Sequence, residues 1–235
     1  MKNLIVASTS TIYGGKFLEY LKPELEKHFK SIKTLLFIPY AKPGGISYES
    51  YTHVVADALK DFEFSVRGIH EFDDPREAIK EAEAIFVGGG NTFVLLDELY
   101  KQKLIEPLRK VLENGTPYLG TSAGSNIAGP DVKTTNDMPI VHPKTLDALD
   151  LIPLNINPHY LDPDPDLKHK GETRETRIKE FHTYNDTTVI GLREGSWIAV
   201  KGDQMLLKGG LNARVFKKDK KPFELPVNSD LSQLI

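Results

Sequence analysis

Short apolar runs alternate with segments of helical periodicity through the first half of the chain. The runs predict short strands, and the segments between them, apolar at i, i+3 and i+4 spacing, predict helices. Strands are expected at 4–8, 34–39, 64–68, 84–87 and 117–120, and helices at 16–28, 48–61, 75–82, 92–100 and 103–113. This alternation predicts a mainly parallel sheet with helices on both faces.

The second half is richer in strands. Extended runs stand at 188–192, 196–201 and 204–207, with a turn at 202–203, and one clear helix is expected at 174–182. The lysine-rich run at 217–221 is interpreted as a charged turn. We expect residues 1–235 to form a single α/β domain with a β-rich C-terminal part.

Composition restricts the possible functions. A hydrophobic share of 40%, a charged share of 27% and a net charge of −3 are ordinary for a globular protein and give no basic surface for nucleic acid or membranes. The sequence has no cysteine, which excludes disulfides, thiolate catalysis and cysteine-based metal sites. Leu4–Ala7 is far shorter than the apolar core of a signal peptide, so we expect a cytoplasmic protein.

The best candidate nucleophile is Ser122, in the G-x-S-x-G sequence at 120–124. It follows a predicted strand and precedes a predicted helix, which is the context of a nucleophile elbow. The N–H of Ala123 and the helix dipole can there stabilise an oxyanion. The alternative is that Ser122 only caps the helix. The strand–turn–helix context favours the catalytic interpretation.

A nucleophilic serine requires a base, and the chain has seven histidines. Those at 28, 53 and 182 lie in helical patterns, and His70 follows an extended run. His159 ends an apolar extended stretch held by prolines at 153 and 158, which favours it over His142 and His169.

Two acids compete to orient the imidazole. Glu194 follows a predicted strand and stands among glycines, whereas Asp137 lies in the T-T-N-D-M-P segment at 134–139. Spacing alone does not decide which carboxylate reaches His159. The order serine, histidine, acid differs from that of α/β-hydrolases, but a triad is defined by its geometry.

Three other segments resemble ligand-binding loops but lack residues that such loops require. The D-P-D-P-D segment at 162–166 imitates a calcium loop but lacks its glycine and its final glutamate, so it is interpreted as a stiff, solvated loop. The segment at 10–17 resembles a phosphate loop, but it has Ser10 in place of the first glycine and Phe17 in place of the required Ser/Thr. The triple glycine at 88–90 lacks the spacing of a dinucleotide-binding loop. No metal or cofactor is implied. The triple glycine is better interpreted as a loop whose N–H groups face a reacting oxygen, with a plain turn as the alternative.

Six segments in order carry a family resemblance: VGGGNTF (87–93), the S-A-G elbow (122–124), TTNDMPIV (134–141), DALDLIPLNINPH (147–159), HKGETRETRI (169–178) and VIGLREGSW (189–197). Together they resemble peptidase E, the α-aspartyl dipeptidases of serine peptidase family S51. Two features depart from that family: Thr121 replaces a common tryptophan, and the segment at 160–168 is unusual.

The resemblance implies a flavodoxin-like fold related to class I glutamine amidotransferases, and metal-independent hydrolysis of dipeptides with N-terminal aspartate, and of some small amides. It implies Ser122 as nucleophile, His159 as base, Glu194 as orienting acid with Asp137 as the alternative, and the N–H groups of Gly90 and Ala123 as the oxyanion hole. Arg174 would bind the aspartate side chain, and Asn91 is a second substrate-binding candidate.

Two rival functions remain at this point. The G-T-S-A-G form of the elbow is similar to that of cyanophycinases, which act on β-linked Asp–Arg units. The third hypothesis is a non-catalytic binding module on the same fold. The expected partner is a small peptide, and the protein is expected to be a monomer or a homodimer.

Overall fold

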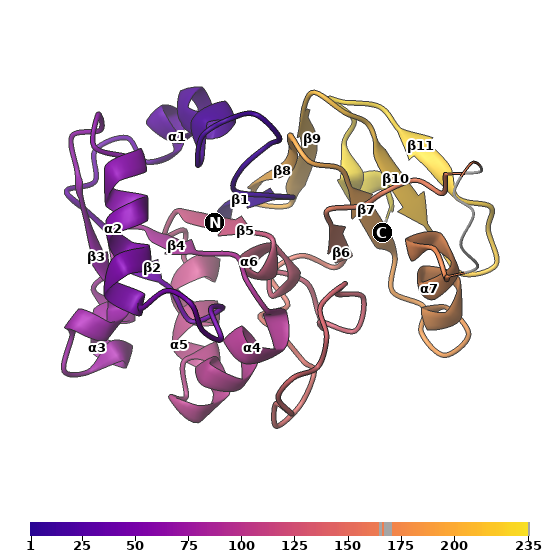
Figure 1. Cartoon of the computed structure of the whole chain (residues 1–235). Coiled ribbons are helices and arrows are strands. Elements are labelled where there is room, and N and C mark those ends of the chain that lie inside the picture. Colours follow the sequence, from indigo (N-terminus) through magenta and orange to yellow (C-terminus); the bar gives the residue numbers. More distant parts are fainter. Residues whose placement is uncertain (165, 167–170, 235) are drawn as a thin grey trace.

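The computed structural model describes residues 1–164, 166 and 171–234 and contains two sheets (Figure 1). The larger sheet has seven strands. In spatial order they are β3 (Ser65–Gly68), β2 (Thr34–Ile38), β4 (Ile85–Val87), β5 (Tyr118–Thr121), β1 (Asn3–Ala7), β8 (Ser196–Lys201) and β9 (Gln204–Gly209). The first five are mutually parallel, while β8 and β9 extend the sheet in antiparallel fashion.

Helices cover both faces of this sheet, because successive side chains of a strand point to opposite sides. In β2, Leu36 and Ile38 join the apolar cluster that contains α3 (Pro75–Lys80), α4 (Thr92–Lys101) and α5 (Ile105–Glu113). Leu35 and Phe37 join the opposite cluster, with α1 (Lys22–His28) and α2 (Tyr48–Ala58). The predicted fold class, a mainly parallel sheet between helical layers, is therefore confirmed.

The second sheet lies in the C-terminal part. Its spatial order is β11 (Phe223–Leu225), β10 (Ala213–Phe216), β7 (Val189–Leu192) and β6 (Asn155–Pro158), with α7 (Arg174–Phe181) packed beside it. β6 and β7 are parallel neighbours, so the residues that follow them emerge at the same edge. In Figure 1 this sheet and α7 occupy one end of the molecule, and α2 and α3 the other.

The structure corrects one predicted helix. The segment at 16–28 was expected to be continuous, but it contains a 3₁₀ turn (Glu19–Leu21) followed by α1. Leu18 adopts a left-handed φ of 57°, and Pro23 stands in the first turn of α1. Proline has no N–H to donate and its ring clashes with the preceding turn, so the helix begins beside it instead of running through it.

Strands β10 and β11 were not predicted, whereas the turn expected at 217–221 is confirmed between them. Short strands in a small sheet are stabilised by their partners more than by local propensity. No helix within the described ranges is both long and apolar enough to span a membrane.

Candidate active site

Ser122 stands at a sharp turn between β5 and the short helix α6 (Ala123–Asn126). Its φ of 53° and ψ of −108° lie outside the regions that L-residues ordinarily occupy, and its hydroxyl makes no capping bond to the helix. A Cβ on Gly124 would lie 2.2 Å from the carbonyl oxygen of Val87, so the turn requires a glycine there. Helix capping therefore does not explain this serine.

His159 is the histidine that meets Ser122. It follows β6 with a left-handed φ of 53°, and its Nε2 accepts from the Ser122 hydroxyl at 2.9 Å. The backbone N–H of His159 donates to Ser8 Oγ at 2.9 Å, and that hydroxyl donates to the carbonyl of Leu192 at 2.7 Å. Ser8 thus anchors the histidine backbone. Sequence reasoning missed it, although it directly follows strand β1.

Glu194 lies on the other side of the imidazole. Its Oε1 accepts from Nδ1 of His159 at 2.6 Å, which is a short hydrogen bond. In the parallel pair β6–β7, Pro158 lies opposite Leu192, so His159 and Glu194 leave the sheet side by side. With Nδ1 protonated toward the carboxylate, Nε2 is left as the acceptor for the serine proton.

Asp137, the alternative acid, has other partners. Its Oδ2 accepts the backbone N–H of Thr92 at 2.7 Å and the hydroxyl of Thr135 at 3.1 Å. Within the described part of the chain it makes no hydrogen bond to His159. The carboxylate thus lies at the N-terminus of α4, where the helix dipole favours negative charge.

The loop after β4 packs against the serine. A Cβ on Gly89 would lie 3.1 Å from that of Ser122, and one on Gly90 would lie 2.2 Å from the carbonyl oxygen of Ala41. Tyr51 donates its buried hydroxyl to the carbonyl of Gly89, and burial raises the pKa of Tyr51 to about 12. No acceptor among the described residues takes the backbone N–H of Gly90 or of Ala123, so both are available to an incoming oxygen.

A cavity of about 570 Å³ opens beside these groups. Ser122, His159, Asp137 and Gly90 are among its lining residues. The volume lies within the range of small-molecule sites. It is larger than that of the lysine-rich hollow near the C-terminal sheet, at about 320 Å³.

The two predicted substrate-binding residues lie outside the lining of this cavity. Arg174, on α7, donates to the carbonyl of Pro158 at 3.4 Å, directly beside His159. Burial lowers the pKa of Arg174, and the charge of Glu194 opposes that shift. Asn91 uses its amide within the protein, because Oδ1 caps α4 and Nδ2 donates to the carbonyl of Met138.

Comparison with known proteins gives the family. The family model described as "Peptidase family S51" matches residues 4–208. The chain belongs to peptidase family S51. It is 48% identical over its full length to a "Probable alpha-aspartyl dipeptidase" of Drosophila melanogaster, of which it covers 98%.

A second relative is "Peptidase E" of Streptomyces coelicolor, also 48% identical, with 99% of this chain and 95% of that protein covered. The resemblance to peptidase E is therefore confirmed. Among solved structures, a peptidase from an acI-B1 Actinobacterium superposes with a TM-score of 0.75 at 16% identity, covering 98% of this chain and 96% of that one. At 16% identity, this superposition shows a similarity of fold alone.

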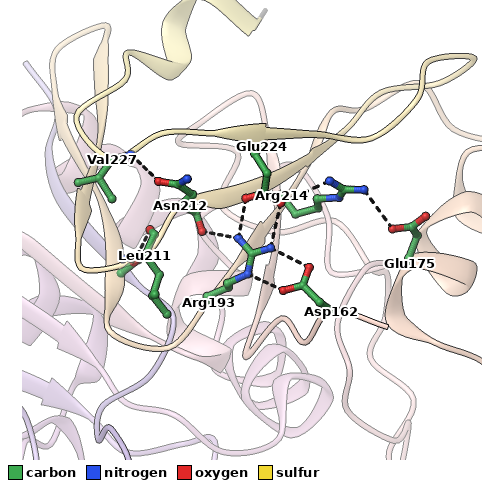
Figure 2. A network of polar contacts seen from close by, with 9 residues as sticks. Asp162, Glu175, Arg193, Leu211, Asn212, Arg214, Glu224 and Val227 are labelled. Carbon is green, nitrogen blue, oxygen red and sulfur yellow. Dashed lines mark hydrogen bonds and ion pairs between the residues drawn. The ribbon is translucent and has the colours of Figure 1, made fainter. Parts of the chain in front are cut away.

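In this S51 peptidase an ion-pair network is centred on Arg193, the residue before Glu194 (Figure 2). Arg193 binds Asp162 through two hydrogen bonds of 2.7 and 2.9 Å, and Glu224 through two of 2.9 Å. These bonds, those to Glu224 foremost, raise the pKa of Arg193 above its ordinary value. Arg193 adjoins Glu194, and Asp162 follows His159 closely. The network therefore ties both backbone segments to strand β11.

The remaining predicted features are placed as follows. Thr121 is fully buried in β5 and does not line the cavity. Asp162, from the segment that imitates a calcium loop, is paired with Arg193, and no described group of three acidic or histidine side chains is arranged to hold a metal. His142 is exposed. His169, the other rival base, lies outside the described residues, as do 165, 167, 168 and 170 of the neighbouring segment.

Proposed function

We propose that this S51 peptidase hydrolyses dipeptides with N-terminal aspartate through an acyl-enzyme on Ser122. The observation that supports this most is the chain of hydrogen bonds from Ser122 through His159 to Glu194, at the edge of an open cavity. A serine activated by an oriented imidazole is the arrangement of acyl-transfer enzymes. The names of the relatives supply the substrate class.

The proposed reaction uses these groups in turn. His159 Nε2 takes the proton of Ser122 as Oγ attacks the peptide carbonyl, and Glu194 stabilises the imidazolium. The N–H groups of Gly90 and Ala123 receive the developing oxyanion. His159 then gives its proton to the leaving amine. Water, deprotonated by the same imidazole, attacks the ester carbonyl; the ester bond then breaks, the imidazolium returns its proton to Ser122 Oγ, and aspartate is released.

Arg174 supplies the selectivity in this proposal. Its guanidinium lies next to Pro158 and within the influence of Glu194, so it is close to the reacting centre. A guanidinium binds a carboxylate bidentately, and a substrate without that carboxylate leaves it unpaired in a half-buried place. The rejection of other N-terminal residues follows from this loss.

Asn91 is kept as a supporting residue. Its capping bonds fix the start of α4 and the backbone next to Gly90, so it would act by holding the oxyanion loop. We also propose that residues 1–235 act as one domain, because one buried cluster contains residues of both sheets. The protein would act in the cytoplasm as a monomer or homodimer, which cell fractionation and light scattering can measure.

The test is release of free aspartate from Asp-Leu, with Asn-Leu, Leu-Leu and β-Asp-Arg in parallel. The proposal expects cleavage of Asp-Leu and rejection of Asn-Leu, which differs by one charged oxygen. Arg174→Met should erase that discrimination, whereas the neighbouring exposed Arg177→Met should not. Cleavage of β-Asp-Arg alone would assign the protein to isopeptidase chemistry, and turnover of none of the four would favour a binding module.

A further inference from the structure

The cavity beside Ser122 is lined by more than the catalytic groups. Its wall also contains the apolar side chains of Phe17, Ile46 and Val54, together with Lys42. Lys42 carries the only permanent positive charge among the described residues that line the cavity. The site thus has an apolar wall with a single cation, and the reaction as derived so far uses neither.

Lys42 is held close to the oxyanion loop by its neighbour. The carbonyl of Ala41 accepts the N–H of Asn91 at 2.7 Å, and Ala41 lies in close contact with Gly90. From there the Lys42 side chain reaches over the ring of Tyr51, with Nζ 5.0 Å from the ring centroid. The ammonium is therefore directed by a buried ring that itself binds the loop through Gly89.

The ammonium of Lys42 is available for a ligand. No described carboxylate lies within ion-pair distance of it. Asp137, the acidic residue among the described lining residues, is bound to the N-terminus of α4 instead. An anion entering the cavity would thus find in Lys42 an unpaired charge, partly shielded from water by the Tyr51 ring.

The two cations belong to different parts of the fold. Arg174 is on α7 and Lys42 is in the segment before α2, and Figure 1 shows helices α7 and α2 at opposite ends of the molecule with α6, which follows Ser122, between them. With the aspartyl side chain directed to Arg174, the leaving residue extends toward Lys42. A peptide chain advances at most ~3.6 Å per residue, so a dipeptide places its terminal carboxylate just beyond the scissile bond.

We propose that Lys42 binds the C-terminal carboxylate of the dipeptide, and that Phe17, Ile46 and Val54 receive its second side chain. This inference rests on the proposed function and adds to it a reason for cleaving dipeptides instead of longer chains. A longer peptide has an uncharged amide at that position, so it loses the ion pair. An apolar second residue, such as leucine, fits the wall best.

The test compares Asp-Leu with Asp-Leu amide, which lacks only the carboxylate. Because Lys42 is half-exposed, water weakens its ion pair with the carboxylate, and we expect about a tenfold preference in kcat/KM for the free acid. Lys42→Met keeps the length and the apolar stem over Tyr51 and should reduce this preference to near unity. The change should appear in KM, because the contact exists before and during the reaction.

Lys60→Met, at an exposed lysine that is not among the lining residues, is the matched control and should keep the full preference. Equal rates on acid and amide in the wild type, or an undiminished preference in Lys42→Met, would overturn the role of Lys42 while leaving aspartyl dipeptide cleavage intact. Failure of the wild type to release aspartate from either compound would instead overturn the proposed function itself.

Discussion

Replacing Glu194 with glutamine tests how much the acid contributes to catalysis by orienting His159 and stabilising its imidazolium. The substitution keeps the shape of the side chain and removes its charge. The carboxylate accepts from Nδ1 at 2.6 Å, and a charge-assisted bond of this kind contributes about 1.5–3 kcal/mol. At about 1.4 kcal/mol per factor of ten, the loss of the bond lowers kcat by roughly 10- to 150-fold.

The solvent exposure of His159 and Glu194 determines how large the loss in kcat is within that range. In the well-studied serine protease triad, with a buried aspartate, loss of the charge costs about 10⁴ in kcat. Here the side chains of His159 and Glu194 are 35% and 44% exposed, so water can replace part of the lost interaction. We therefore expect a loss in the lower part of that range, about 10- to 30-fold in kcat, with KM for Asp-Leu almost unchanged.

The assay is steady-state aspartate release with kcat and KM resolved separately. Asp137→Asn is the matched comparison, because it removes one charge from the rival acid. Urea unfolding of both variants separates a catalytic loss from a loss of stability. An unchanged kcat in Glu194→Gln, together with a fall of about 10- to 30-fold in a stably folded Asp137→Asn, would refute the assignment of Glu194.

Three further predictions concern stability. Ser122→Gly should be more stable than Ser122→Ala by about 1–2 kcal/mol in urea unfolding, because glycine tolerates the positive φ of this turn. Arg193→Gln should lose about 1 kcal/mol, because it removes a largely buried guanidinium that binds two exposed carboxylates, whereas Lys218→Gln, at an exposed pair, should lose no more than ~0.5. Burial lowers the pKa of His28 from 6.5 to about 4, so between these pH values the unfolded chain binds more protons than the folded one. The free energy of unfolding of the wild type should therefore fall on acidification from about pH 7 to pH 5. We expect this fall to be larger than that of His28→Gln by roughly 1–2 kcal/mol.

The local pattern was sufficient for the central sheet. Most of the parallel strands are short apolar runs, such as that of β2, and the helices between them have regular apolar spacing, so both are encoded within a few residues. The segment 16–28 shows the limit of this reasoning. Its apolar spacing is helical, but Pro23 stops the helix from extending backward.

In the candidate site, too, some residues could be predicted from the local sequence and others could not. Ser122 could be predicted because a nucleophile elbow is a local motif with a required strand and helix. The preference for Glu194 over Asp137 needed the register of β6 and β7, which joins residues far apart in the chain. No local pattern indicated a structural role for Arg193, because its partners Asp162 and Glu224 are each 31 residues away.

The central claim, a peptidase that acts through Ser122, is tested most directly by aspartate release from Asp-Leu by the wild type and by Ser122→Ala under identical conditions. The variant keeps Cβ and removes only the hydroxyl that faces His159, so its circular dichroism and unfolding midpoint should match those of the wild type. We predict that the wild type releases aspartate and that the folded variant releases none above the uncatalysed rate. Turnover by the variant at a rate comparable to the wild type would contradict the claim.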